Sequence, residues 1–117
     1  MIELVSEGRC IGCDICVKVC PTNVFEAVPD RAPVIARQDD CQTCFMCELY
    51  CPVDALYVAP EAELESTVDE TELGDRGLLG SYREAVGWGT GRQSGASRDQ
   101  SFRLLPLIAA EPPRRSP

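Results

Sequence analysis

Residues 10–21 read CIGCDICVKVCP, and residues 41–52 read CQTCFMCELYCP. Both stretches have the pattern C-x2-C-x2-C-x3-C-P, and a shift of 31 residues, from 10 to 41, superimposes them. Together they hold all eight cysteines of the chain. An apolar run that is typical of a short strand follows each copy, at residues 24–28 and 55–59. The cysteine-rich part of the chain is therefore an internal repeat of two similar units.

The spacing of the cysteines suits an iron–sulfur cluster. Three cysteines at two-residue intervals form a tight loop whose backbone N–H groups can point at cluster sulfurs, and the fourth follows on a short helical turn. The proline after it does not continue a helix, so the chain turns away. Structural zinc usually takes two separated C-x2-C pairs, which this run does not resemble. We expect 4Fe–4S clusters, and the alternatives are zinc, disulfides or clusters with a purely structural role.

The cysteine-rich unit is small, and its size favours a metal framework. A unit of about 60 residues hides only about 60% of its unfolded surface, and small units often need additional cross-links. The N-terminus, MIEL, lacks the basic and apolar regions of a secretory signal. We therefore expect a cytoplasmic protein, and disulfides are rare in that reducing compartment. No apolar run reaches about 18 residues, so we expect no membrane span.

The composition excludes several classes of function. The chain has no histidine, which excludes a Rieske centre, a histidine-based zinc site and a Ser-His-Asp triad. Its formal net charge is −8, and its pI near 4.4 argues against binding to nucleic acid as a main activity. No acid–base constellation or substrate pocket is recognisable in the sequence. We therefore expect a non-catalytic, electron-transferring subunit of an oxidoreductase complex.

Charge divides the chain into three segments. Residues 1–60 hold all the cysteines and have a net charge of −5. Residues 61–75 carry seven acids and no base, which is typical of a solvated spacer or a weak helix. Residues 76–117 carry seven arginines against three acids. We expect a domain at 1–60, an acidic connector at 61–75 and an extended, partner-binding tail at 76–117.

Residues 1–60 resemble the bacterial two-cluster (2 × 4Fe–4S) ferredoxin family, because all eight ligand positions and both following prolines are present. The resemblance implies an α+β, pseudo-twofold fold with two β-hairpins and two short helices. It also implies electron transfer, one electron at a time. In agreement with that fold, residues 2–5 could pair with residues 56–58, and a turn-like break at residues 29–32 separates two apolar runs.

The same resemblance implies how the two clusters share the cysteines. In two-cluster ferredoxins the fourth cysteine of each run ligates the other cluster. The expected ligands of cluster 1 are Cys10, Cys13, Cys16 and Cys51. The expected ligands of cluster 2 are Cys41, Cys44, Cys47 and Cys20. Gly12, which lies inside the first loop, is expected to let the backbone approach a sulfur closely.

The third segment contains apolar anchors between glycines and arginines. Leu78, Tyr82 and Val86 lie on one face of a predicted helix, which Gly87 would end after two turns. Ser81-x-x-Glu84 fits a capping box at its start. Trp88 and an apolar patch at residues 102–108 follow. These residue types are common anchors of interfaces, so we expect the tail to become ordered on a larger partner.

This layout resembles the iron–sulfur subunits of flavoprotein reductases such as the adenylylsulfate reductase small subunit, in which a tail wraps around the flavoprotein. The resemblance implies a flavoprotein (FAD) subunit as the partner of the tail and a soluble electron carrier as the second partner. Two alternatives remain. The chain could be a free, diffusing ferredoxin with a disordered tail, or a structural or redox-sensing iron–sulfur protein.

Overall fold

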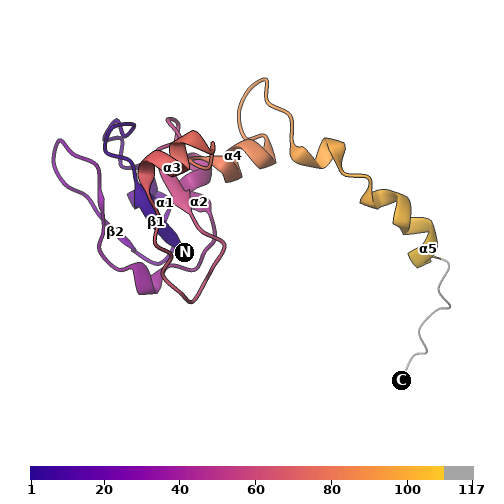
Figure 1. Cartoon of the computed structure of the whole chain (residues 1–117), viewed down its shortest axis with the longest axis horizontal. Coiled ribbons are helices and arrows are strands. Elements are labelled where there is room, and N and C mark those ends of the chain that lie inside the picture. Colours follow the sequence, from indigo (N-terminus) through magenta and orange to yellow (C-terminus); the bar gives the residue numbers. More distant parts are fainter. Residues whose placement is uncertain (110–117) are drawn as a thin grey trace.

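The computed structural model describes residues 1–109 and has an α+β architecture of short strand pairs and short helices (Figure 1). The strands are β1 (Ile2–Val5), β2 (Phe25–Glu26), β3 (Val34–Ile35) and β4 (Leu56–Val58). The helices are α1 (Ile15–Val19), α2 (Met46–Tyr50), α3 (Glu70–Asp75), α4 (Ser81–Val86) and α5 (Leu105–Ala109). Short 3-10 turns are η1 (Gln38–Asp40), η2 (Gly95–Arg98) and η3 (Ser101–Leu104). The predicted α+β class is confirmed.

The four strands form two separate antiparallel pairs. Strand β1 pairs with β4, with Val5 opposite Leu56, and β2 pairs with β3, with Phe25 opposite Ile35. Both pairings confirm the sequence prediction. Only β2 and β3 form a hairpin, however, because β1 and β4 come from opposite ends of the cysteine-rich unit. This differs from the two hairpins that the family resemblance implied.

Helices α1 and α2 occupy equivalent places in the repeat. Each follows a residue with a left-handed backbone, Asp14 with φ 57° and Phe45 with φ 62°. Each ends at the fourth cysteine of its motif, Cys20 or Cys51, whose backbone is extended. Helices of five residues are unstable alone in water, so they depend on packing. The two helices pack against each other.

The hydrophobic core joins the two halves of the repeat. It consists of buried side chains from both strand pairs and from the ends of the cysteine motifs. These residues are Ile2, Val24, Phe25, Cys47, Cys51, Ala55, Leu56 and Val58. Four further cysteines, which are only partly buried, pack against this cluster. The thiols therefore lie at the boundary of the core, where apolar side chains limit the access of water.

The acidic connector is irregular in its first part and helical in its second. Helix α3 begins after Asp69, whose carboxylate accepts a hydrogen bond of 3.1 Å from the N–H of Thr71. Leu73 of this helix and Leu79 beyond it are both buried. Residues 70–80 therefore pack on the cysteine-rich unit and do not extend away from it.

Helix α4 forms where the apolar periodicity predicted it, and it ends at Gly87 with φ 69°. The predicted capping box is wrong, because Gly80 precedes the helix and Ser81 is its first residue. The Ser81 hydroxyl instead lies 3.4 Å from a carboxylate oxygen of Glu48 in α2. Since α4 packs against α2, the part of the expected tail up to residue 88 is folded onto the domain.

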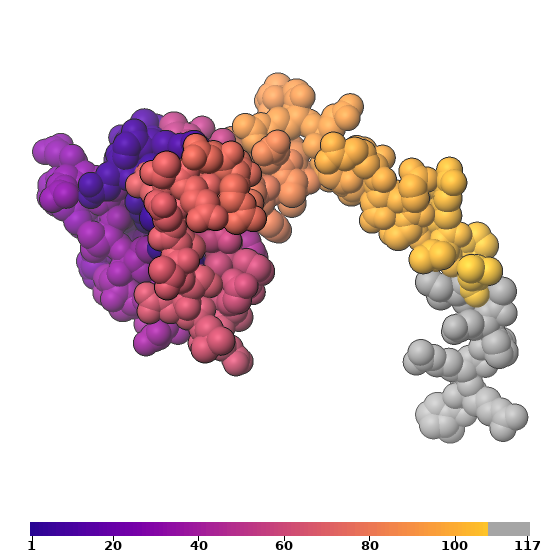
Figure 2. Space-filling model, in the orientation of Figure 1, coloured from indigo at the N-terminus to yellow at the C-terminus, as the bar shows by residue number. Residues whose placement is uncertain are grey.

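The segment after α4 leads away from the cysteine-rich unit (Figures 1 and 2). It contains η2, η3 and α5. Its exposed apolar side chains are Phe102, Leu104, Leu105 and Leu107. Residues 110–117 of the expected tail lie outside the described residues. Within residues 1–109, no helix has the length and apolar character needed to span a bilayer.

Candidate metal centre

Two narrow cavities of similar size lie among the cysteines. Including their openings, they enclose about 320 and 310 Å³ that protein atoms do not fill. The first, here called the first site, is lined by the thiols of Cys10, Cys13, Cys16 and Cys51. The second, here called the second site, is lined by the thiols of Cys20, Cys41, Cys44 and Cys47. Each site thus brings together three cysteines of one motif and the fourth cysteine of the other.

The short helices produce this exchange of cysteines. Helix α1 carries Cys16 at the first site and ends at Cys20 at the second. Helix α2 carries Cys47 at the second site and ends at Cys51 at the first. Four residues of helix rise by about 6 Å. The two sites therefore lie at opposite ends of the same pair of helices, a short distance apart.

Backbone N–H groups point at the cysteine sulfurs in the same way in both halves. Gly12 and Thr43 donate to the Sγ atoms of Cys10 and Cys41 over 3.4 Å. Val24 and Ala55 donate to the Sγ atoms of Cys20 and Cys51 over 3.4 and 3.3 Å. These donors occupy positions that are 31 residues apart. Hydrogen bonds of this kind stabilise thiolates and tune the potential of a bound cluster.

The close approach of the backbone to sulfur does not require glycine. Gly12 has φ 72°, and Thr43 at the equivalent place of the second motif adopts φ 52°. Both N–H groups lie 3.4 Å from a cysteine sulfur. The expected backbone approach at Gly12 is therefore present, but a side chain is accommodated in the same conformation.

Burial controls the protonation of the thiols. It raises the pKa of Cys16 to about 12 and raises the pKa of Cys47 as well. Burial also acts to raise the pKa of Cys20, but N–H groups, that of Val24 foremost, outweigh it and leave the pKa below its ordinary value. Metal binding must displace the protons of the buried thiols, so iron incorporation becomes less favourable as the pH falls.

The donor set fits an iron–sulfur cluster. All eight cysteines are free thiols, and soft thiolate ligands select zinc or iron–sulfur clusters. In residues 1–109, no three Cys, Asp or Glu side chains converge on the position of a single ion. The four thiols of each site instead surround a cavity. A four-iron cluster binds its thiolates at separate iron corners, and this spacing of the thiols matches it.

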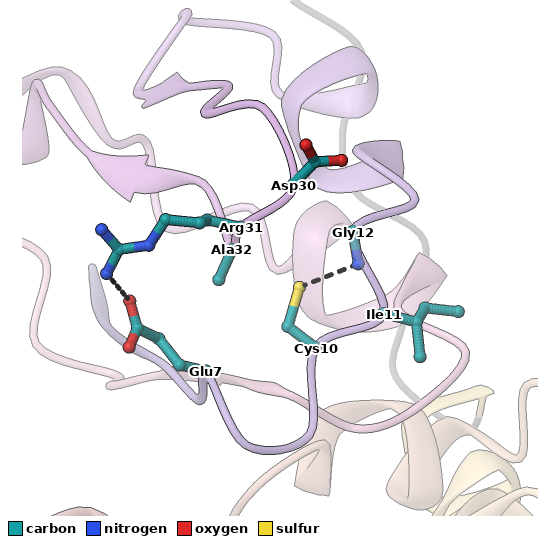
Figure 3. Close-up of a pocket in the computed structure, with 7 residues that line it drawn as sticks. All are labelled: Glu7, Cys10, Ile11, Gly12, Asp30, Arg31 and Ala32. Atoms are coloured by element: carbon teal, nitrogen blue, oxygen red, sulfur yellow. Dashed lines mark hydrogen bonds and ion pairs between the residues drawn. The ribbon is translucent and has the colours of Figure 1, made fainter.

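A larger, open pocket of about 530 Å³ lies on the surface outside the first site (Figure 3). An ion pair of 3.2 Å between Glu7 and Arg31 lies at its edge, and both side chains are mostly exposed. Such an ion pair contributes about 1 kcal/mol at most. Cys10, Ile11 and Gly12 also line this pocket, so it exposes the first cysteine loop to solvent.

Glu48 is a buried residue that the sequence analysis did not single out. Its side chain is 0% exposed and accepts N–H groups from Val58 at 3.0 Å and from Tyr82 at 2.7 Å. Burial raises the pKa of this carboxyl, and the hydrogen bonds act against that rise. One signal was available, because the equivalent position of the first motif holds the apolar Val17.

Comparison with known proteins identifies the family. The 4Fe-4S dicluster domain matches residues 9–66. An uncharacterized ferredoxin of Methanocaldococcus jannaschii is 49% identical over 63 residues, which are 52% of this chain and 100% of that protein. The chain belongs to the ferredoxin family. A ferredoxin of Methanothermococcus thermolithotrophicus is 44% identical over 56 residues, which are 46% of this chain and 92% of that protein.

The ferredoxin relatives match about half of this chain. An uncharacterized polyferredoxin-like protein of M. jannaschii is 34% identical over 67 residues, which are 47% of this chain and 39% of that protein. No solved structure matches the chain. Membership of the ferredoxin family implies 4Fe–4S clusters and electron transfer. The match to the dicluster domain ends at residue 66, so α3, α4 and the segment beyond them are additions to that domain.

Proposed function

We propose that this ferredoxin binds one 4Fe–4S cluster at each of its two sites, in a pseudo-twofold arrangement, and relays single electrons to or from a flavoprotein partner. The observation that carries the proposal is the pair of cavities, each lined by four free thiols from both motifs. A 4Fe–4S cluster supplies one-electron oxidation and reduction when bound. Free thiols at both sites also suit the reducing cytoplasm.

The chain itself contributes ligands, hydrogen bonds and the exclusion of water. The cysteine thiolates hold the metal, and the backbone N–H groups of both loops support the sulfurs. Buried side chains such as Val24 and Leu56, which line the second and first sites respectively, limit water. Because α1 and α2 each connect the two sites, the path between them is only a few residues long.

The segment beyond α4 supports a protein partner. Phe102 and Leu107 are 60% and 71% exposed, although apolar side chains of this size are usually buried in folded proteins. Arg92, Arg98 and Arg103 give the same segment a basic character. A basic, apolar segment next to an acidic domain suits a partner that contacts both. We propose that the flavin-carrying subunit binds this segment and that a soluble carrier meets the ferredoxin domain.

A free ferredoxin is the second candidate. The relative from M. jannaschii matches this chain over its whole length, and that match covers only 52% of this chain. The domain that it shares with this chain therefore occurs without residues equivalent to the second half. In this alternative, the domain meets its redox partners by diffusion and the basic segment has no role in binding them.

Removal of residues 99–117 separates the two candidates. We expect the truncated protein to keep its iron, because α3 and α4 remain in place, but to lose co-purification with the flavoprotein. The double substitution Phe102→Ser and Leu105→Ser should cause the same loss in the full chain. The measurement is a pull-down from the native cell, with bound flavin determined by fluorescence.

Leu64 provides the matched control, since it is a large apolar side chain, 73% exposed, outside the segment. We expect Leu64→Ser to leave co-purification unchanged. If the truncated protein retained a flavoprotein as well as the full chain does, the segment would not be the binding element. If the full chain retained none, the free ferredoxin would be the better account.

A further inference from the structure

Residues 70–88, here called the cover, are fixed to the ferredoxin domain at a buried carboxylate. Glu48 of α2 is 0% exposed, and it accepts the N–H of Tyr82 at 2.7 Å and the hydroxyl of Ser81 at 3.4 Å. Its other oxygen accepts the N–H of Val58 in β4 at 3.0 Å. Gly80 adds a backbone bond of 3.0 Å to the carbonyl of Leu56. The cover is thus tied to α2 and β4 of the domain.

One aromatic side chain of the cover reaches the lining of the second site. The ring of Tyr82 stacks on the ring of Phe45, with centroids 4.7 Å apart and an angle of 26° between the planes. Phe45 lines the second site beside its thiols. Cys47 of this site is only 8% exposed. Tyr82 therefore covers the side chain that separates this site from solvent.

The first site has a different lining at the equivalent position. Asp14 lies 31 residues before Phe45, has the same left-handed backbone, and lines the first site. Cys16, the equivalent of Cys47, is only partly buried. The contact of the cover nearest to this site is a hydrogen bond from Arg83 to the backbone carbonyl of Cys51. The two sites thus share their ligand pattern but differ in what shields them.

We infer that Tyr82 is a positioning residue of the second site, which acts through Phe45 to exclude water there and so sets the reduction potential of that site apart from the first. The inference rests on the proposed function. Reduction adds negative charge to a cluster, and a water-poor, apolar surrounding disfavours added charge. Loss of the Tyr82 ring should therefore make the potential of the second site less negative.

The experiment is a redox titration of the full, iron-loaded chain and of Tyr82→Ala, followed by NMR of the cysteine β-protons, which are assigned to individual ligands and so separate the sites. We expect a roughly tenfold change in the reduction equilibrium of the second site, about 59 mV for one electron, and no change at the first. Tyr82→Phe keeps the stack and should behave as the native chain. Point variants are needed because deletion of the cover would also remove the Arg83 contact to Cys51.

The outcomes separate this inference from the proposed function. If Tyr82→Ala leaves both potentials unchanged, or shifts both equally, while the chain still holds two reducible clusters, the inference is wrong and the proposed function stands. If the native chain holds no reducible clusters, both are wrong. Tyr82→Leu, which keeps apolar volume without a ring, provides a second variant if Tyr82→Ala does not fold.

Discussion

Removal of iron by an anaerobic chelator unfolds residues 1–60. A hydrophobic core in a unit of this size supplies only about 3–5 kcal/mol. Metal bound to thiolates in a small domain can supply on the order of 10 kcal/mol to folding. The two strand pairs here contain only two to four residues per strand, and α1 and α2 contain five residues each. These elements are therefore held together largely by the cysteines and what they bind.

Far-ultraviolet circular dichroism during chelation, together with hydrogen exchange of the β1 and β4 amides, measures this effect. We expect loss of the native spectrum in step with loss of iron, and fast exchange at Leu4 and Leu56. Addition of zinc to the apoprotein is the matched control, and it should not restore the native spectrum. Retention of the native spectrum without iron would show that the core of Ile2, Val24, Leu56 and their neighbours is sufficient.

Substitution of the fourth cysteine of each motif damages the cluster of the other motif. In the structure Cys20 lies with the thiols of the second motif, and Cys51 lies with those of the first. We expect Cys20→Ala to cost the second site its four-iron cluster and Cys51→Ala to cost the first site its own. Each variant should therefore lose about half of the iron. Iron and sulfide analysis, with NMR of the remaining cysteine ligands, measures which cluster is lost.

Thr22→Val is the control for Cys20→Ala, because the Thr22 hydroxyl lies 3.8 Å from the Cys20 sulfur and is not a ligand. We expect this variant to keep both clusters. The assignment of the ligands would be wrong if Cys20→Ala disturbed only the cluster of Cys10, Cys13 and Cys16. It would also be wrong if either variant kept its full iron content.

The sequence predicts the cysteine-rich unit well because its signals are local and repeated. Each motif brings three thiols together within a few residues, and the apolar runs beside the motifs form the paired strands β1–β4 and β2–β3. The left-handed residues recur with the motif, at Asp14 and Phe45 and at Gly12 and Thr43. A pattern that occurs twice in one chain supplies a check that a single motif lacks.

The cover was less predictable because its contacts are long-range. The periodicity of α4 indicated a helix, but a helix of two turns says nothing about the surface that it packs on. Its anchor, Glu48, is more than 30 residues away, and a lone acid in a helix is usually a solvated one. The segment 76–88 was therefore expected to need a partner, whereas its own domain provides the contact. The comparison of Glu48 with Val17 was the one available signal.

Anaerobic reductive titration of the purified full chain tests the central claim most directly, because it counts the electrons that the two sites accept. The account predicts about eight iron and eight sulfide per chain and the reversible uptake of two electrons, one at each site. Loss of the oxidised spectrum should reverse completely on reoxidation, with no loss of iron. A chain that holds its full iron but takes up no electrons reversibly would contradict the account and would leave the clusters with a structural role only.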